Sequence, residues 1–76
     1  MRDRMEQIIE RIDTVGEDGR HVEILRYLHT RIERTNAGRR VRIGAERLAL
    51  HSGQAVQPLG TAEFIRSDTG ERLVRV

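Results

Sequence analysis

The stretch Arg40-Val41-Arg42-Ile43, followed after Gly44 by Arg47-Leu48-Ala49-Leu50-His51, carries the clearest secondary-structure signal of the sequence. Polar and apolar side chains alternate in both parts, which is the period-two pattern of a half-buried β-strand. Gly44 interrupts this alternation and predicts a bulge or a bend. We therefore expect an extended segment over residues 40–50.

Glycine-containing turns divide the rest of the C-terminal half into short segments. The turn signals are Ser52-Gly53, Leu59-Gly60 and the hairpin-like Asp68-Thr69-Gly70-Glu71. They predict strands over residues 54–58, 62–67 and 71–76. Because proline has no N–H to donate, we expect the strand at Val56-Gln57-Pro58 to lie at an edge of the sheet or to end there.

The N-terminal half is less clearly patterned. A turn at Glu17-Asp18-Gly19-Arg20 precedes a segment over residues 20–33 that we expect to be a strand. The alternative is a helical hairpin around residues 16–19, because apolar side chains over residues 22–32 also fall on one helical face. Val22 and Ile24 alternate in one phase and Leu25 and Tyr27 in the other, which needs a bulge or burial on both faces. The polar stretch Glu33–Gly38 is the best candidate for a loop.

Residues 1–15 are compatible with two structures. Apolar side chains fall on one helical face at spacings of four and three residues, which favours a short helix. A first β-strand fits the same residues about as well. The residues on the helical face are Met1, Met5, Ile8, Ile12 and Val15.

These signals predict one small domain over residues 1–76 that is mainly β. We expect a small antiparallel sheet, open barrel or sandwich built from hairpins, with a short N-terminal helix as an option. The chain has no cysteine and no apolar stretch long enough for a signal peptide or a membrane span. A cytoplasmic location is therefore expected.

The C-terminal stretch Phe64-Ile65-Arg66-Ser67-Asp68-Thr69-Gly70-Glu71-Arg72-Leu73-Val74-Arg75-Val76 resembles the close of certain small bacterial all-β proteins. In those proteins a final Phe-x-Ile…Thr-Gly hairpin follows a shorter one like Leu50–Val56, and an earlier turn is similar to Asp18-Gly19-Arg20. The resemblance implies a β fold and a bacterial source, and it brings no known activity. Ala62-Glu63 stands where those proteins have an acidic turn.

The sequence offers little catalytic chemistry. His21, His29 and His51 lack the paired spacing of zinc ligands, and Ser52 next to His51 sits in a turn. Without lysine, the phosphate-binding Gly-x-x-x-x-Gly-Lys motif cannot occur. We therefore expect no enzymatic activity, no metal, no cofactor and no small-molecule substrate.

All fourteen basic residues are arginine, and the densest cluster is Arg39, Arg40 and Arg42. The excess of arginine has two explanations, codon bias or function, and the sequence does not choose between them. Set along one face or loop, the three side chains would form a nucleic-acid-binding surface. Only Tyr27 and Phe64 could stack on bases, and the net charge is only +2. The sequence favours the other interpretation, a solvated strand edge whose arginines discourage aggregation.

Self-association is the function that the sequence favours. A chain of 76 residues buries a small core, and the content of isoleucine, leucine and valine is high for that size. Small domains often gain stability by oligomerisation when they lack disulfides and metals. We therefore expect a homodimer, or another homo-oligomer or protein complex, in which the edge strand at Val56-Gln57-Pro58 is one contact.

Overall fold

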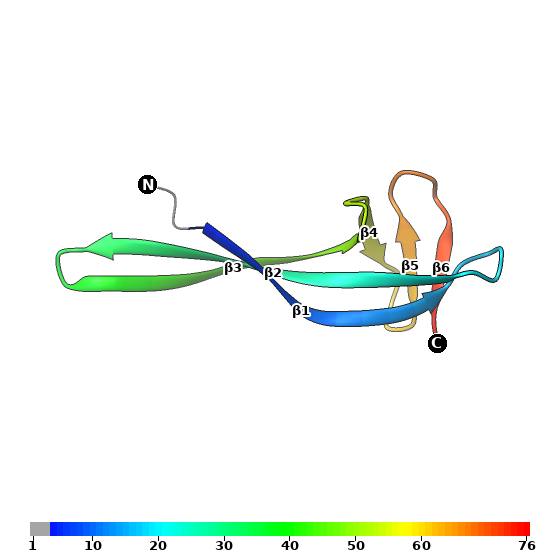
Figure 1. Cartoon of the computed structure of the whole chain (residues 1–76), viewed down its shortest axis with the longest axis horizontal. Helices are drawn as coiled ribbons and strands as arrows, with labels where there is room; N and C mark the ends of the chain where they lie inside the picture. The colour runs from blue at the N-terminus through cyan, green and yellow to red at the C-terminus, as the bar shows by residue number, and fades with distance from the viewer. Residues whose placement is uncertain (1–3) are drawn as a thin grey trace.

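The computed structural model describes residues 4–76, which form six β-strands and no helix (Figure 1). Consequently, these residues include no helix of the length and apolar character that a membrane crossing needs. The mainly-β prediction is confirmed, and the expected C-terminal strands all occur. The strands are β1 (Arg4–Val15), β2 (His21–Thr35), β3 (Gly38–Leu50), β4 (Ala55–Pro58), β5 (Glu63–Arg66) and β6 (Arg72–Arg75).

The six strands close into an antiparallel barrel in sequence order. Each strand pairs with the next, and β6 returns to the end of β1, where Thr14 lies opposite Arg75 and Val15 opposite Val74. The expectation of an open barrel or a sandwich is therefore wrong. Closure depends on this contact between the end of β1 and the last strand, β6, which no local pattern in the sequence indicates.

The interior of the barrel receives apolar side chains from every strand. Thr14 is also fully buried there, and its hydroxyl donates a 2.6 Å hydrogen bond to the carbonyl of Val22. Each fully buried aliphatic or aromatic side chain contributes about 1.5–3 kcal/mol relative to an exposed one. The core consists of Ile12, Ile24, Leu48, Leu50, Val56, Phe64 and Leu73.

The N-terminal segment is a strand, so the optional helix is wrong for residues 4–15; residues 1–3 lie outside the described part. Pairing with β2 runs from Arg4 opposite Arg31 to Val15 opposite His21, with a bulge between Ile8 and Glu10. The bulge shifts the alternation by one residue. That shift explains why the apolar spacing imitates a helix in the sequence.

Strand β2 runs for fifteen residues without a bulge. The register of its pairing shifts twice, and in both cases the extra residue lies on the neighbouring strand, β1 or β3. Ile24 and Leu25 are both buried, so the two apolar phases expected here reflect burial on both faces. Glu33, Arg34 and Thr35 belong to this strand, which corrects the loop predicted over residues 33–38. Only Asn36 and Ala37 lie outside the two strands.

Strand β4 ends at Pro58, which confirms the expectation that the strand ends at the proline. It does not lie at an edge of the sheet. Leu48 and Ala49 pair with it on one side, and Phe64 to Arg66 on the other. The edge contact expected at Val56-Gln57-Pro58 is therefore wrong, because barrel closure leaves this strand with two neighbours.

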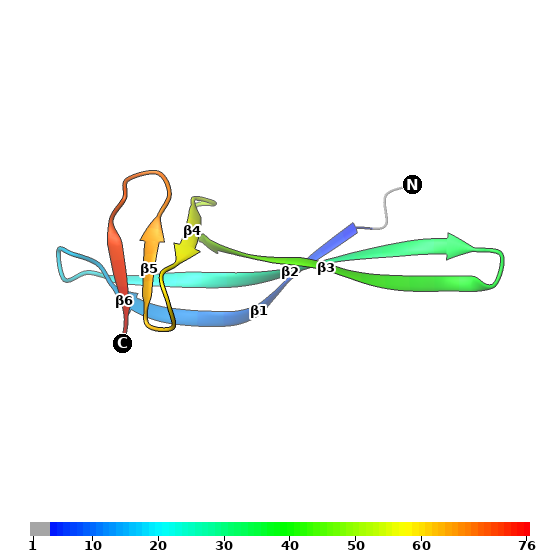
Figure 2. The same cartoon turned by 180° about the vertical axis from the view of Figure 1, so that it is seen from behind.

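The molecule is elongated, with extents of 54 × 21 × 16 Å. Figures 1 and 2 show why: β2 and β3 form part of the barrel wall, and their hairpin extends far beyond the barrel. The residues of this projection, 29–46, are called the arm below. The start of β1 lies beside the base of the arm, and among residues 4–76 the arm beyond Arg31 consists of two strands.

Gly70 closes the β5–β6 turn with φ +76°, in the left-handed region that disfavours a Cβ atom. No heavy atom lies within 4 Å of the position a Cβ would take, so strain comes from the backbone alone. We expect Gly70→Val to lower the free energy of unfolding by about 1–2 kcal/mol. Urea denaturation measures this change. Gly70→Asn should cost less, because asparagine tolerates this conformation, and equal stability of all three proteins would show that the turn is unstrained.

Candidate functional site

The arm is a continuous ribbon that starts at a bulge and ends in a tight turn. At its base, Leu28 lies opposite Glu46 and Thr30 opposite Ile43, so Gly44 and Ala45 together oppose His29. A Cβ on Gly44 would come within 3.1 Å of the carbonyl oxygen of His29. The bulge predicted at Gly44 is thus confirmed, and a side chain there would make a tight contact because the neighbouring backbone approaches closely.

The far end of the arm is ordered by the side chain of Thr35. Its hydroxyl donates to the carbonyl of Gly38 (3.1 Å) and accepts from the N–H of Ala37 (3.3 Å). The short turn fixes the register, with Arg34 opposite Arg39 and Ile32 opposite Val41. Paired residues on neighbouring strands project to the same side, so this register decides which side chains share a face.

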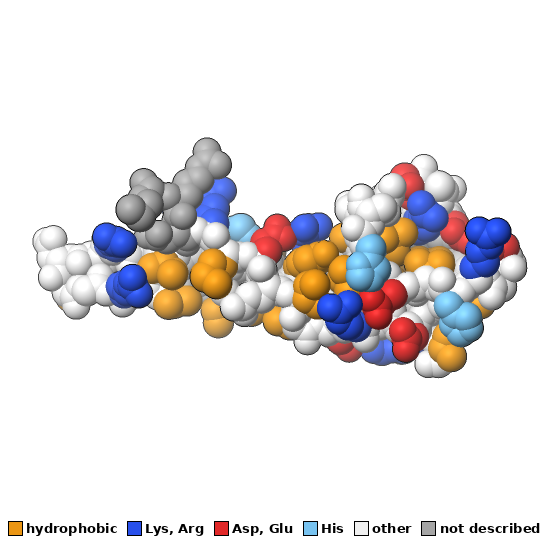
Figure 3. All heavy atoms as spheres, viewed as in Figure 1, with side chains coloured by type: hydrophobic (Ala, Val, Ile, Leu, Met, Phe, Trp, Pro, Cys, Tyr) orange, Lys and Arg blue, Asp and Glu red, His pale blue; other side chains and the backbone are white. Residues whose placement is uncertain are grey.

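One face of the arm is apolar and open to solvent. Ile32 and Val41 lie side by side, and Ile43 follows with Thr30 and Met5 across the base. Val41 is 62% exposed and Ile43 73%, although both are large aliphatic residues. Figure 3 shows apolar side chains gathered along the projecting hairpin, well away from the barrel. We call Met5, Ile32, Val41 and Ile43 the apolar face.

The opposite face of the arm is basic. Arg4, Arg31 and Arg42 are cross-strand neighbours on β1, β2 and β3, and Arg40 follows Arg42 on the same side of β3. Glu33 lies opposite Arg40 and forms an ion pair with Arg42 at 3.3 Å. We call Arg4, Arg31, Arg40 and Arg42 the basic face.

The structure divides the cluster Arg39, Arg40 and Arg42 between the two faces. Because side chains alternate along a strand, Arg40 and Arg42 point one way and Arg39 the other. The single surface suggested for the three arginines is therefore wrong. Arg31, which the sequence analysis missed, joins Arg40 and Arg42 through the hairpin register.

Arginines on the barrel and on the arm differ in their partners. On the barrel, each forms an ion pair with a carboxylate: Arg11 with Glu23, Arg20 with Asp18, Arg26 and Arg75 with Glu10, Arg66 with Asp68 and Glu71, and Arg72 with Glu63. Within residues 4–76, no carboxylate lies within ion-pair distance of Arg4, Arg31, Arg39 or Arg40. Arginines without a carboxylate within ion-pair distance are thus gathered on the arm and beside its base, at Arg4, Arg31, Arg39 and Arg40.

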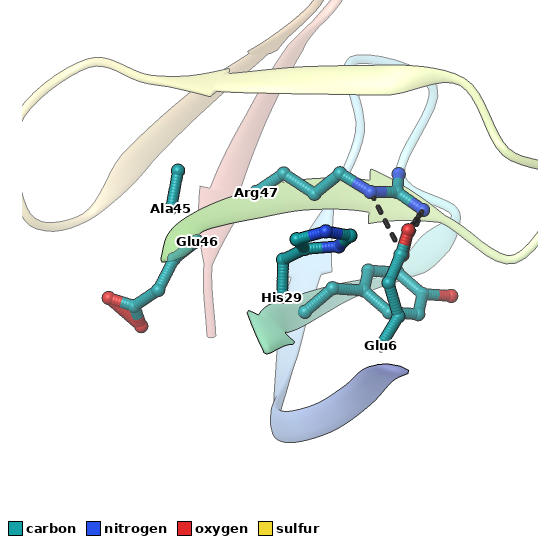
Figure 4. A pocket seen from close by; sticks show the side chains of 6 residues that line it. Glu6, His29, Ala45, Glu46 and Arg47 are labelled. Carbon is teal, nitrogen blue, oxygen red and sulfur yellow. Dashed lines mark hydrogen bonds and ion pairs between the residues drawn. The ribbon is translucent and has the colours of Figure 1, made fainter. Parts of the chain in front are cut away.

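A polar cluster holds the base of the arm against the barrel (Figure 4). Arg47 donates to both carboxylate oxygens of Glu6, at 2.9 Å for the shortest contact, and its guanidinium lies 4.5 Å from the ring centre of Tyr27. These hydrogen bonds lower the pKa of Glu6 below its ordinary 4.5, despite the opposing effect of desolvation. The cluster joins β1, β2 and β3, so it fixes the direction of the arm.

The same residues line a shallow hollow of about 240 Å³ together with His29, Ala45 and Glu46. In Figure 4 the carboxylate of Glu46 points away from the Glu6–Arg47 pair, consistent with its register on the apolar side of the arm. The hollow is smaller than the ~300 Å³ of a typical ligand pocket. Two of its charged groups, Glu6 and Arg47, are already paired with each other.

The three histidines do not assemble into a site. His21 and His29 share a side of β2 eight residues apart, about 26 Å along the strand. His51 lies 2.6 Å from Glu23, and together with Arg11 it lowers the pKa of that carboxyl. Among residues 4–76, no group of three histidine or acidic side chains is arranged to hold a metal ion.

Comparisons of the chain with protein-family models, with curated proteins and with solved structures give no match. The resemblance to small bacterial β proteins and the cytoplasmic location stay predictions. The two faces of the arm are the features of this chain that indicate a function.

The lowered pKa of Glu6 predicts acid sensitivity at the base of the arm. A carboxyl whose pKa is depressed by folding adds stability above its ordinary pKa, and this stability is lost as the pH falls below 4.5. We expect Glu6→Gln to be less stable than the parent at pH 7 and to lose less stability on acidification. Urea unfolding at neutral and acid pH measures both effects. Asp13→Asn, which removes an exposed carboxylate without an ion pair among residues 4–76, is the control, and an identical pH profile for Glu6→Gln and the parent would contradict the prediction.

Proposed function

We propose that this protein is a non-enzymatic interaction module whose arm pairs with the arm of a second copy. The observation that supports the proposal most is the side-by-side exposure of Val41 (62%) and Ile43 (73%) on a ribbon that the barrel core does not need. Contiguous exposed apolar side chains mark interaction sites more often than single ones. The apolar face is therefore the contact surface of the proposal.

Charge complementarity favours a second copy as the occupant. Arg34 and Arg39 lie at the outer end of the apolar side, and Glu46 lies at its inner end beside Leu28. If two arms pack face to face and antiparallel, the outer end of each meets the inner end of the other. The two-fold axis then passes near Thr30 and Ile32, and the arginines of each copy approach Glu46 of its partner.

The size of the contact predicts a weak dimer. The apolar side between Leu28 and Arg34 is about 20 Å long at 3.3 Å per residue, and only two to three strands wide. Such a face buries less than the ~800 Å² per partner of a standard stable interface. We therefore expect a concentration-dependent dimer with a dissociation constant of roughly 1–100 µM.

Two serine substitutions on the apolar face should abolish dimerisation. We expect the parent protein at about 200 µM, above the expected dissociation constant, to approach twice the 8.8 kDa mass of the chain. Val41→Ser/Ile43→Ser should give the monomer mass at the same concentration. Light scattering coupled to size-exclusion chromatography measures the mass, and circular dichroism confirms that the barrel remains folded.

The matched control is Leu59→Ser/Val76→Ser, which removes two exposed aliphatic side chains from the barrel. This variant should dimerise like the parent. A monomer mass for the parent over the whole concentration range, or equal loss in both variants, would contradict the proposal.

Charge reversal tests the antiparallel arrangement separately. Glu46→Arg should weaken the dimer, because it places like charges against Arg34 and Arg39 of the partner. Adding Arg39→Glu in the same chain should restore part of the affinity. No restoration would mean that the two ends of the arms do not meet, even if a dimer forms.

A further inference from the structure

We propose that the basic face of the arm binds the phosphate backbone of double-stranded DNA. This surface lies opposite the apolar face, so the inference goes beyond self-association and does not depend on it. It uses Arg4, Arg31, Arg40 and Arg42, of which only the last two belong to the arginine cluster visible in the sequence.

The register of the arm places like charges next to each other. Arg4, Arg31 and Arg42 occupy cross-strand positions on three neighbouring strands, which are about 4.8 Å apart. Arg40 lies two residues further along β3, about 6.7 Å away. Like charges directly opposite each other destabilise a sheet. A polyanion bound across this face would offset the repulsion.

The basic face also holds arginines whose positive charge no carboxylate of the described residues neutralises through an ion pair. On the barrel, carboxylates neutralise the arginines locally, as in the pairs Arg11–Glu23 and Arg26–Glu10. On the basic face, Glu33 forms an ion pair with Arg42. Within residues 4–76, no carboxylate lies within ion-pair distance of Arg31 or Arg40, although Glu33 is the cross-strand neighbour of Arg40. The attraction for an anion is therefore strongest at Arg31 and Arg40, with Arg4 beside them.

The shape of the arm favours duplex DNA over the other polyanions. Beyond Arg31 the described residues of the arm form a two-stranded β-ribbon, with β1 beside its base. Such a ribbon fits the major groove of B-form DNA, which is about 12 Å wide, whereas the major groove of duplex RNA is too narrow. Single-strand binding needs exposed aromatic rings. Here Tyr27 is covered by Arg47 and Phe64 is buried in the barrel.

Three phosphate contacts predict modest, salt-dependent binding. With Arg4, Arg31 and Arg40 each neutralising one phosphate, the slope of log K against log salt is about −2.7. Affinity then falls about 20-fold between 50 and 150 mM salt. We expect a dissociation constant of roughly 1–10 µM at the lower salt concentration and only weak binding at the higher one.

Fluorescence anisotropy with a labelled mixed-sequence duplex of about 24 base pairs tests the proposal. Arg31→Gln/Arg40→Gln should weaken binding at least tenfold at about 50 mM salt and reduce the slope to about −1. The control Arg20→Gln/Arg72→Gln removes the same charge from exposed barrel arginines. It should bind like the parent.

Equal losses in the two variants would overturn the proposal, because they would show attraction by net charge alone. Absence of binding at about 50 mM salt would overturn it as well. Preference for the corresponding single strand, or binding to phosphatidylserine vesicles without binding to the duplex, would assign the basic face to another polyanion. Because Arg31 and Arg40 lie off the apolar face, the mass of the Arg31→Gln/Arg40→Gln variant reports self-association independently.

Discussion

The whole structure depends on the mismatch between one long strand and the short strands that close the barrel. Strand β2 runs for fifteen residues without a bulge, whereas β4, β5 and β6 have four residues each. The short strands can enclose only the part of the β2–β3 hairpin near Ile24 and Leu50. The remainder must project into solvent, and since the pleat of β2 is unbroken, the side that lines the core continues outward as the apolar face.

The residues at the junction between barrel and arm fix the direction in which the arm projects. Bulges at Ile9 and at Gly44-Ala45 change the register of β1 and β3 where the barrel ends. The Glu6–Arg47 ion pair and the contact of Arg47 with Tyr27 then connect the three strands on their outer side. The arm is therefore a continuation of the barrel wall, and its two faces are presented in fixed directions.

The sequence predicts much of the fold because its signals are local. Alternation over residues 40–51 and a glycine turn before each short strand suffice to place β3 to β6. Closure of the barrel does not follow from the sequence, because it requires Val15 to lie opposite Val74, a contact between distant residues with no local pattern. The sequence does not distinguish strand from helix over residues 4–15, because the bulge at Ile9 imitates helical spacing.

The candidate site was only half visible for similar reasons. Period two alone separates Arg39 from Arg40 and Arg42, so that correction was available from the sequence. The sequence does not indicate that Arg31 belongs to the basic face, because its position beside Arg42 depends on the register that the Asn36-Ala37 turn sets. Exposure of Val41 and Ile43 likewise follows from the lengths of β4 to β6, which limit how far the barrel covers β3.

Distances between spin labels in the dimer test most directly the central claim that two arms pack face to face and antiparallel. The chain has no cysteine, so single substitutions give unique labelling sites. Arg31→Cys places a label near the proposed two-fold axis on the outer side of each arm. With paired faces about 10 Å apart, double electron–electron resonance should give a distance of roughly 25 Å. Labels on Arg20→Cys, at the far end of the barrel, should be separated by roughly 80 Å, too far to detect. A short distance at Arg20, or no dipolar coupling at Arg31, would contradict the account.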